Sequence, residues 1–321
     1  MKTNHNNFLK LAFNIAKVNL GKTGINPSVG CIVVKNNSVI SSACTSVNGR
    51  PHAEFNALKF QKNFKNSDLY VTLEPCTHYG ITPPCTNIIA KKGVKRVFFS
   101  FDDSDKRTAK RSKKKLSKKK IKVIKKLNNN FKDFYQSYFL NQKYNTPFID
   151  AKIAISKDYL TINKKAKWIT NSLSRRRTHL IRSEYDAIIS TSKSINKDNS
   201  LLNCRLAGFN SNKPDLIIID LMLKIKTNLS LFKNINKRKI LIVTSISSSK
   251  KISYLRKKGV KIILIKSLDK KTDFINLFKI LKKYAYNRIL VESGLIFLNK
   301  LLKENLIFNL YVFQKSSKLG R

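Results

Sequence analysis

The chain has 321 residues, of which 42% are apolar, so it can form two domains of ordinary size, each with its own core. Its formal net charge is +47, but Lys and Arg are spread along the whole chain and Lys dominates, so we attribute the charge to solvated positions and consider a nucleic-acid partner unlikely. No stretch is apolar enough to span a membrane, and the N-terminus lacks the apolar core of a signal peptide, which favours a cytoplasmic protein.

The first half of the chain alternates between helix and strand patterns. Residues 8–19 have helical periodicity, and two short strands are expected within 30–43, joined by a tight turn at Asn36 and Asn37. The most basic segment, 106–126, has no aromatic residue on which a base could stack, and we expect a solvated helix followed by a short strand. This alternation predicts a layered α/β domain. Between these parts we expect a helix at 52–62, a strand at 69–75, a helix at 85–93 and a strand at 94–101.

A second alternating series starts after Pro147. Its strand candidates are almost continuous runs of Ile, Leu and Val, a pattern typical of strands that are buried on both faces of a parallel sheet. We therefore predict two domains, residues 1–145 and 146–321. The strands expected in the second domain are 148–156, 187–192, 215–220, 239–245, 261–266 and 288–293.

Three side chains of the first half could bind a metal ion. They are His52 in "PHAEFNAL", Cys76 in "EPC" and Cys85 in "PPC". One imidazole and two thiolates would give a tetrahedral zinc three ligands and leave the fourth position for water, as in catalytic zinc sites. Zinc lowers the pKa of such a water, and Glu54 could then carry its proton to a leaving amine.

Each of these residues alone is weak evidence. A lone HxE is more often an ordinary helix start, and a lone cysteine is usually packed in a core. The combination of HxE with two later cysteines, the first of them in a PC pair, is typical of zinc deaminases. We expect Cys76 and Cys85 to lie at loop-to-helix junctions, where a helix N-terminus favours the thiolate. Five cysteines in 321 residues argue against a disulfide scaffold.

The spacing of the two cysteines points to one family. Eight residues separate Cys76 from Cys85, and "THYGITPP" between them accompanies "GINPSVGCIVV" upstream. Over nearly its whole length the sequence resembles the bifunctional deaminase-reductases of riboflavin biosynthesis, in which "NPxVGCV", "HAE" and "LEPCxHxGxTPPC" occur in this order. The resemblance implies a homo-oligomer.

The resemblance implies a fold and an activity for each half. The N-terminal domain would have the three-layer cytidine-deaminase-like fold and hydrolyse, with Zn²⁺, the amine of 2,5-diamino-6-ribosylamino-4(3H)-pyrimidinone 5′-phosphate. The C-terminal domain would have the α/β fold of dihydrofolate reductase and use NADPH to reduce the ribosyl group to a ribityl chain.

The family's motifs also imply residue roles. His52, Cys76 and Cys85 match its zinc ligands, Glu54 its proton shuttle, and Asn26 and His78 its substrate contacts in the deaminase. The NADPH positions match Ala154, Ser156, Trp168, Ser194, Asp198 and Gly294, and the substrate positions of the reductase match Arg182, Leu202, Arg205 and Glu292. Without the resemblance, Asn26 would be a turn residue, His78 a solvated loop residue, Trp168 a core aromatic and Asp198 a helix cap.

The chain departs from the family's pattern in several places, of which three bear most on the two sites. Ile81 stands where a basic residue is usual, and residues 102–111 replace a glycine-rich substrate loop. The sequence ends at Arg321, some tens of residues before the family's usual end, so we expect an apparently truncated reductase sheet.

Two other functions stay open from the residues. A nucleic-acid base deaminase would suit the charge, and it would bind polynucleotides tightly with a steep dependence on salt. A decayed deaminase-fold protein with a structural zinc would retain the metal without releasing ammonia.

Overall fold

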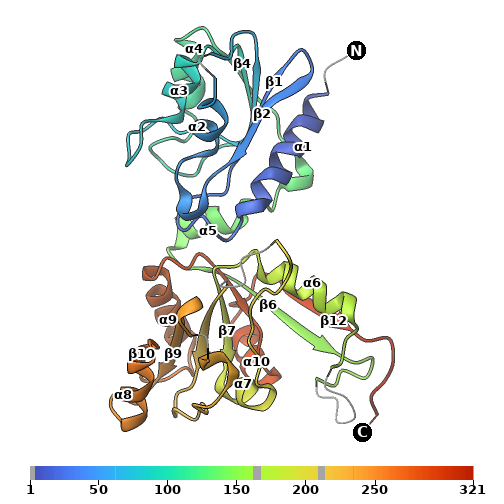
Figure 1. The fold of residues 1–321 in the computed structure, drawn as a ribbon, viewed down its shortest axis with the longest axis vertical. Helices are drawn as coiled ribbons and strands as arrows, with labels where there is room; N and C mark the ends of the chain where they lie inside the picture. Colours follow the sequence, from blue (N-terminus) through green and yellow to red (C-terminus); the bar gives the residue numbers. More distant parts are fainter. Residues whose placement is uncertain (1–3, 62, 162–167, 209–213, 234, 321) are drawn as a thin grey trace. The chain divides into compact units, whose positions relative to one another are not determined.

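The computed structural model describes residues 4–61, 63–161, 168–208, 214–233 and 235–320. The chain folds into two compact units, Met1–Tyr144 and Asn145–Arg321, which have separate hydrophobic cores (Figure 1). In the described ranges, no helix has both the length and the apolar character needed to cross a membrane.

The first unit is built on a five-stranded mixed sheet with the order β2-β1-β3-β4-β5. Its first two strands form an antiparallel hairpin, and β1 also pairs antiparallel with β3, whereas β3, β4 and β5 run parallel. The predicted turn at Asn36 and Asn37 is confirmed, since both residues have positive φ, which two-residue hairpin turns require and asparagine tolerates. The strands are β1 (Gly30–Lys35), β2 (Ser38–Cys44), β3 (Asp68–Leu73), β4 (Arg96–Phe101) and β5 (Lys122–Lys125).

Helices cover both faces of this sheet. Alternate residues along β1 point to opposite faces, so Ile32 packs with Leu9 of the first helix, while Cys31 packs with Ala57 of the second. The helices are α1 (His5–Ala16), α2 (Ala53–Leu58), α3 (Cys85–Lys91), α4 (Ser112–Ser117) and α5 (Gln136–Tyr144). With α1 on one face and α2 and α3 on the other, the unit has three layers (Figure 1).

The second unit contains a seven-stranded sheet with the order β10-β9-β8-β7-β11-β6-β12, in which every pair runs parallel. Helices α9 and α10 contribute to the core on one face, and α6, α7 and α8 to the core on the other. The strands are β6 (Phe148–Ile155), β7 (Ala187–Thr191), β8 (Asp215–Ile219), β9 (Ile240–Thr244), β10 (Lys261–Leu264), β11 (Arg288–Val291) and β12 (Leu310–Gln314). The helices are α6 (Ser172–Arg182), α7 (Ser192–Asp198), α8 (Lys250–Lys257), α9 (Lys271–Lys283) and α10 (Leu295–Lys303).

The two edge strands of this sheet differ from the strands that the sequence predicted. The prediction of full burial is wrong for β10, because it lies at one edge and leaves Leu264 48% exposed. At the other edge, β12 was not predicted; its residues alternate between exposed and partly buried, a pattern with a weaker apolar signal than the central strands have. Parallel strands need helices on both faces for full burial, and an edge strand has a neighbour on one side only.

Candidate active site

Three elements of the first unit bring the predicted metal ligands together. His52 is the residue before α2, Cys85 is the first residue of α3, and Cys76 lies in the loop after β3. Nδ1 of His52 and the two Sγ atoms all lie within 4.8 Å of one another. The segments that carry them are 24 and 33 residues apart along the chain, counted from His52.

The spacing of these three atoms fits a tetrahedral zinc ion. Nδ1 of His52 lies 3.4 Å from Sγ of Cys85 and 3.7 Å from Sγ of Cys76. Zinc–nitrogen and zinc–sulfur bonds at tetrahedral angles would place neighbouring ligand atoms about 3.6 Å apart. The backbone N–H of Cys85 also donates to Sγ of Cys76 at 3.1 Å, which holds that sulfur in place.

The two thiols differ in acidity. A hydrogen bond from the Cys85 side chain lowers the pKa of Cys76 to about 4, and His52 adds to this effect. The same hydrogen bond, together with burial, raises the pKa of Cys85. The prediction that both cysteines begin helices is wrong for Cys76, whose acidity comes from its hydrogen bonds. Metal binding would release the proton that Cys85 keeps.

Glu54 lies beside the triad in the first turn of α2, and its residue is only 3% exposed. Burial raises the pKa of its carboxyl group to about 7, with a further contribution from the Cys76 thiolate, while His52 lowers it. A divalent cation held by the triad would lower this pKa, because a nearby positive charge favours the carboxylate. A carboxyl group whose pKa responds to the neighbouring charges in this way can accept and return a proton.

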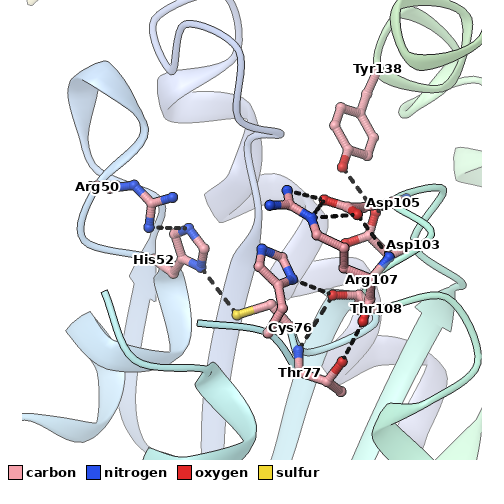
Figure 2. A network of polar contacts seen from close by, with 10 residues as sticks. Arg50, His52, Cys76, Thr77, Asp103, Asp105, Arg107, Thr108 and Tyr138 are labelled. Atoms are coloured by element: carbon pink, nitrogen blue, oxygen red, sulfur yellow. Dashed lines mark hydrogen bonds and ion pairs between the residues drawn. The ribbon is translucent and has the colours of Figure 1, made fainter. Parts of the chain in front are cut away.

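His78 is oriented by the segment that replaces the family's glycine-rich loop. Its Nδ1 lies 3.0 Å from Oγ1 of Thr108, which also accepts from the backbone N–H of Thr77 at 3.3 Å (Figure 2). Next to Thr108, Asp105 and Arg107 form a bidentate ion pair. Residues 102–111 thus pack against the site despite their unusual sequence.

Asn26 lies against the backbone that leads to His52. Its Nδ2 donates to the carbonyl oxygen of Gly49 at 3.1 Å, and its backbone carbonyl oxygen accepts from the hydroxyl of Thr23 at 2.7 Å. The bond to Gly49 fixes the side chain and the bond from Thr23 fixes the main chain, which is compatible with a substrate contact.

Glu74, which the sequence analysis did not single out, organises this part of the site. Its carboxylate is buried and accepts from the backbone N–H groups of Asp103 at 3.3 Å, Lys110 at 2.9 Å and Ser112 at 3.0 Å. The three bonds hold residues 103–112 against the end of β3 and so set the position of Thr108. The sequence did contain a signal for this residue, because Glu74 is a carboxylate that directly follows a fully buried strand.

If the first unit has the expected deaminase activity, Glu74→Gln should raise its KM, and it should destabilise the unit by about 1–3 kcal/mol. The amide would place an NH₂ group against backbone donors, so the segment that orients His78 would shift. Zinc content should be unchanged. Steady-state ammonia release and urea unfolding would measure both effects, with the exposed Asp133→Asn as the matched control. An unaltered KM would show that this segment does not position the substrate.

In the second unit, the predicted substrate residues Arg182 and Glu292 form a buried bidentate ion pair. Nε and Nη2 of Arg182 donate to the two carboxylate oxygens at 2.6 and 2.9 Å, and Nζ of Lys152 lies 3.7 Å from Oε2. The exposed fractions of the Arg182 and Glu292 side chains are 11% and 8%. Although burial alone would raise the pKa of Glu292, Arg182 holds it below its usual value.

The other predicted reductase residues fall into two groups. Ser156, Ser194 and Gly294 follow the carboxyl ends of the adjacent strands β6, β7 and β11, the edge at which α/β sheets bind ligands; Oγ of Ser194 accepts from the N–H of Gly294 at 3.2 Å. Ala154 lies within β6, and Arg205 is joined to Arg182 through Asn203. The remaining three predicted residues are described by the structure, but they neither follow these strand ends nor form a hydrogen bond with Arg182. Leu202 is buried and has positive φ, and Asp198 is exposed at the end of α7. Trp168 is 53% exposed, with the Arg175 guanidinium over its ring.

Replacing Glu292 with alanine is expected to destabilise the second unit by about 3–5 kcal/mol, because Arg182 and Lys152 would lose their buried counter-charge. The shift between the urea unfolding curves of variant and parent measures this loss. Asp269→Ala removes the partner of an exposed ion pair with Lys300 and should cost less than about 1 kcal/mol. Equal shifts for the two variants would contradict the expectation.

Comparison with known proteins gives matches to both units. Residues 2–101 match the family model of the cytidine and deoxycytidylate deaminase zinc-binding region, and residues 147–321 match that of the RibD C-terminal domain. A riboflavin biosynthesis protein RibD from Buchnera aphidicola is 34% identical, with 98% of this chain and 87% of the relative covered; one from Aquifex aeolicus is 31% identical over the same shares.

Solved structures agree with these matches. A Thermotoga maritima diaminohydroxyphosphoribosylaminopyrimidine deaminase/5-amino-6-(5-phosphoribosylamino)uracil reductase superposes with a TM-score of 0.85 at 26% identity, covering 99% of this chain and 88% of that one. Acinetobacter baumannii RibD gives 0.84 at the same identity and coverage. The predicted combination of a cytidine-deaminase-like and a dihydrofolate-reductase-like fold is confirmed.

Proposed function

Because the chain belongs to the RibD family of riboflavin biosynthesis proteins, we propose that it catalyses two successive steps on a phosphorylated pyrimidine. The first is hydrolytic deamination of 2,5-diamino-6-ribosylamino-4(3H)-pyrimidinone 5′-phosphate, and the second is NADPH-dependent reduction of its ribosyl group to a ribityl chain. The observation that carries the proposal is the triad of His52, Cys76 and Cys85 with the buried carboxyl group of Glu54 beside it.

In the deaminase site, His52, Cys76 and Cys85 would hold Zn²⁺. When bound, zinc lowers the pKa of a water molecule and so supplies a nucleophile near neutral pH. Glu54 would take up the proton of that water and deliver it toward the leaving amine, a transfer for which its buried carboxyl group beside His52 and Cys76 is placed. His78 and Asn26 would contact the substrate, since hydrogen bonds to Thr108 and Gly49 fix both side chains.

In the reductase site, the groups at the carboxyl ends of β6, β7 and β11 would bind NADPH, which supplies the hydride. Ser194 and Gly294 are already joined by a hydrogen bond, and Ser156 is close to the end of β6. Arg205, whose side chain is exposed, would contact the substrate phosphate, while Arg182 would be oriented by its pair with Glu292.

We also propose that the protein works in the cytoplasm as a homo-oligomer. Absence of a membrane-spanning helix from the described ranges is compatible with this location. Exposed Leu310 and Val312 on the edge strand β12 support an oligomer, because an exposed sheet edge offers a surface for another chain.

The direct test is incubation of purified zinc-loaded protein with the diaminopyrimidine phosphate, with and without NADPH, followed by mass analysis of the products. We expect loss of the amine in both reactions and a further gain of two hydrogens only when NADPH is present. Zinc retention without ammonia release would contradict the proposal and favour a decayed deaminase fold. Salt-sensitive binding of a polynucleotide would instead favour a nucleic-acid deaminase.

A further inference from the structure

Arg50 reaches from the proposed metal centre to the loop that contains Thr82. Its Nη1 donates to Oγ1 of Thr82 at 2.7 Å. The same atom lies 3.4 Å from Nε2 of His52, a contact that Figure 2 shows. Within the described ranges, no carboxylate forms an ion pair with this partly buried guanidinium. The chain therefore places an uncompensated positive charge beside the deaminase site.

The neighbouring imidazole adds a second donor at the same place. Nδ1 of His52 faces the two sulfurs, so an imidazole that binds a metal through Nδ1 carries its proton on Nε2. Nε2 of His52 and Nη1 of Arg50 are then both donors, and neither can accept from the other. An anionic oxygen near the two groups could accept a hydrogen bond from each.

Arg50 and His78 both lie beside Gly80, which carries no side chain that would separate them from a ligand. A Cβ atom at residue 80 would lie 3.5 Å from Nη2 of Arg50 and 4.0 Å from Nε2 of His78. Because Nδ1 of His78 is engaged by Thr108, its Nε2 is the ring nitrogen beside Gly80. The adjacent Ile81 is 87% exposed and adds no charge. Two nitrogen-bearing side chains thus approach the position that a Cβ atom on residue 80 would occupy.

We propose that Arg50 and His78 form a phosphate subsite of the deaminase, and that Arg50 sets its preference for a phosphorylated over an unphosphorylated pyrimidine. The inference rests on the proposed deaminase function, whose substrate carries a 5′-phosphate. Guanidinium groups suit this role because their planar fork of donors matches phosphate oxygens. The bond to Thr82 holds the fork at the edge of the site.

The test compares Arg50→Gln and Arg50→Lys with the parent, using the diaminopyrimidine phosphate and its dephosphorylated form. We expect R50Q to raise the KM for the phosphorylated substrate by about 10- to 100-fold. Its kcat, its zinc content and its KM for the dephosphorylated substrate should stay within about twofold of the parent. R50K keeps the charge but not the fork, so its KM should be intermediate.

Lys10→Gln removes an exposed charge from α1 and should leave both KM values unchanged. Equal losses for the two substrates in R50Q would overturn the proposal, because Arg50 would then only support the loop; an unchanged KM would do the same. If the parent releases ammonia from neither substrate, the proposed function fails. Calorimetric titration with ribose 5-phosphate then tests the phosphate subsite without any need for catalysis. The parent should bind one molecule more than R50Q, and equal binding by the two proteins would overturn the proposed subsite.

Discussion

Replacing Glu54 with glutamine is expected to lower the rate of ammonia release by about 10²- to 10⁴-fold, the usual contribution of a positioned proton-transfer group. The amide has nearly the shape of the carboxyl group but cannot accept and return a proton. Since Glu54 stands next to His52 and outside the triad, zinc content should equal that of the parent. Ammonia assays and elemental analysis of the same sample would measure both quantities.

The second unit supplies an internal control for this variant. NADPH-dependent reduction of the already deaminated substrate should proceed at the parental rate, because Glu54 belongs to the other compact unit. A Glu54→Gln protein that releases ammonia at more than about a tenth of the parental rate would exclude this carboxyl group as the proton carrier.

Replacing Cys85 with serine is expected to weaken zinc binding by at least about 100-fold and to abolish ammonia release. Cys85 is one of three ligand atoms, and a serine hydroxyl does not form the thiolate that zinc prefers. Among the described residues, Cys76 is the one other thiol of the triad, so no further cysteine is placed to replace Cys85. Competition with a colorimetric chelator would measure zinc affinity.

Cys44→Ser is the matched control for that experiment. Cys44 is a free thiol of the same unit, lies outside the triad and contacts Asn19, which can also donate to a serine oxygen. It should bind zinc like the parent. Zinc affinity that is equal in the Cys85 and Cys44 variants would mean that the metal binds elsewhere.

Local sequence patterns predicted the central elements well. Buried strands such as β8 and β9 are continuous apolar runs, and the Asn36–Asn37 turn is a short-range signal, so neither needs knowledge of distant contacts. The edge strand β12 has no such run, and its existence depends on pairing with β6. Propensity alone does not decide a strand that is exposed on alternate residues.

The residues of the candidate site also divide into those that local sequence patterns predict and those that depend on distant contacts. His52, Glu54, Cys76 and Cys85 occur in a pattern that carries its own chemistry, and the structure brings them together. The bonds of Glu74 run to backbone groups 29 to 38 residues away, and the pairing of Arg182 with Glu292 spans 110 residues. Neither could be read from one sequence, because the partners meet only once the sheets have formed.

Glu74 holds the segment 103–112 through main-chain groups, so the segment can change much of its sequence and keep its position. The carboxylate accepts from main-chain N–H groups, which every residue type except proline can present. Substitutions at many positions of this stretch can therefore accumulate, even to the basic composition seen here, with two Lys and two Arg, while its path beside the active site persists. The course of this main-chain segment thus depends on one distant carboxylate more than on its own side chains, apart from residues such as Thr108, whose hydroxyl contacts His78.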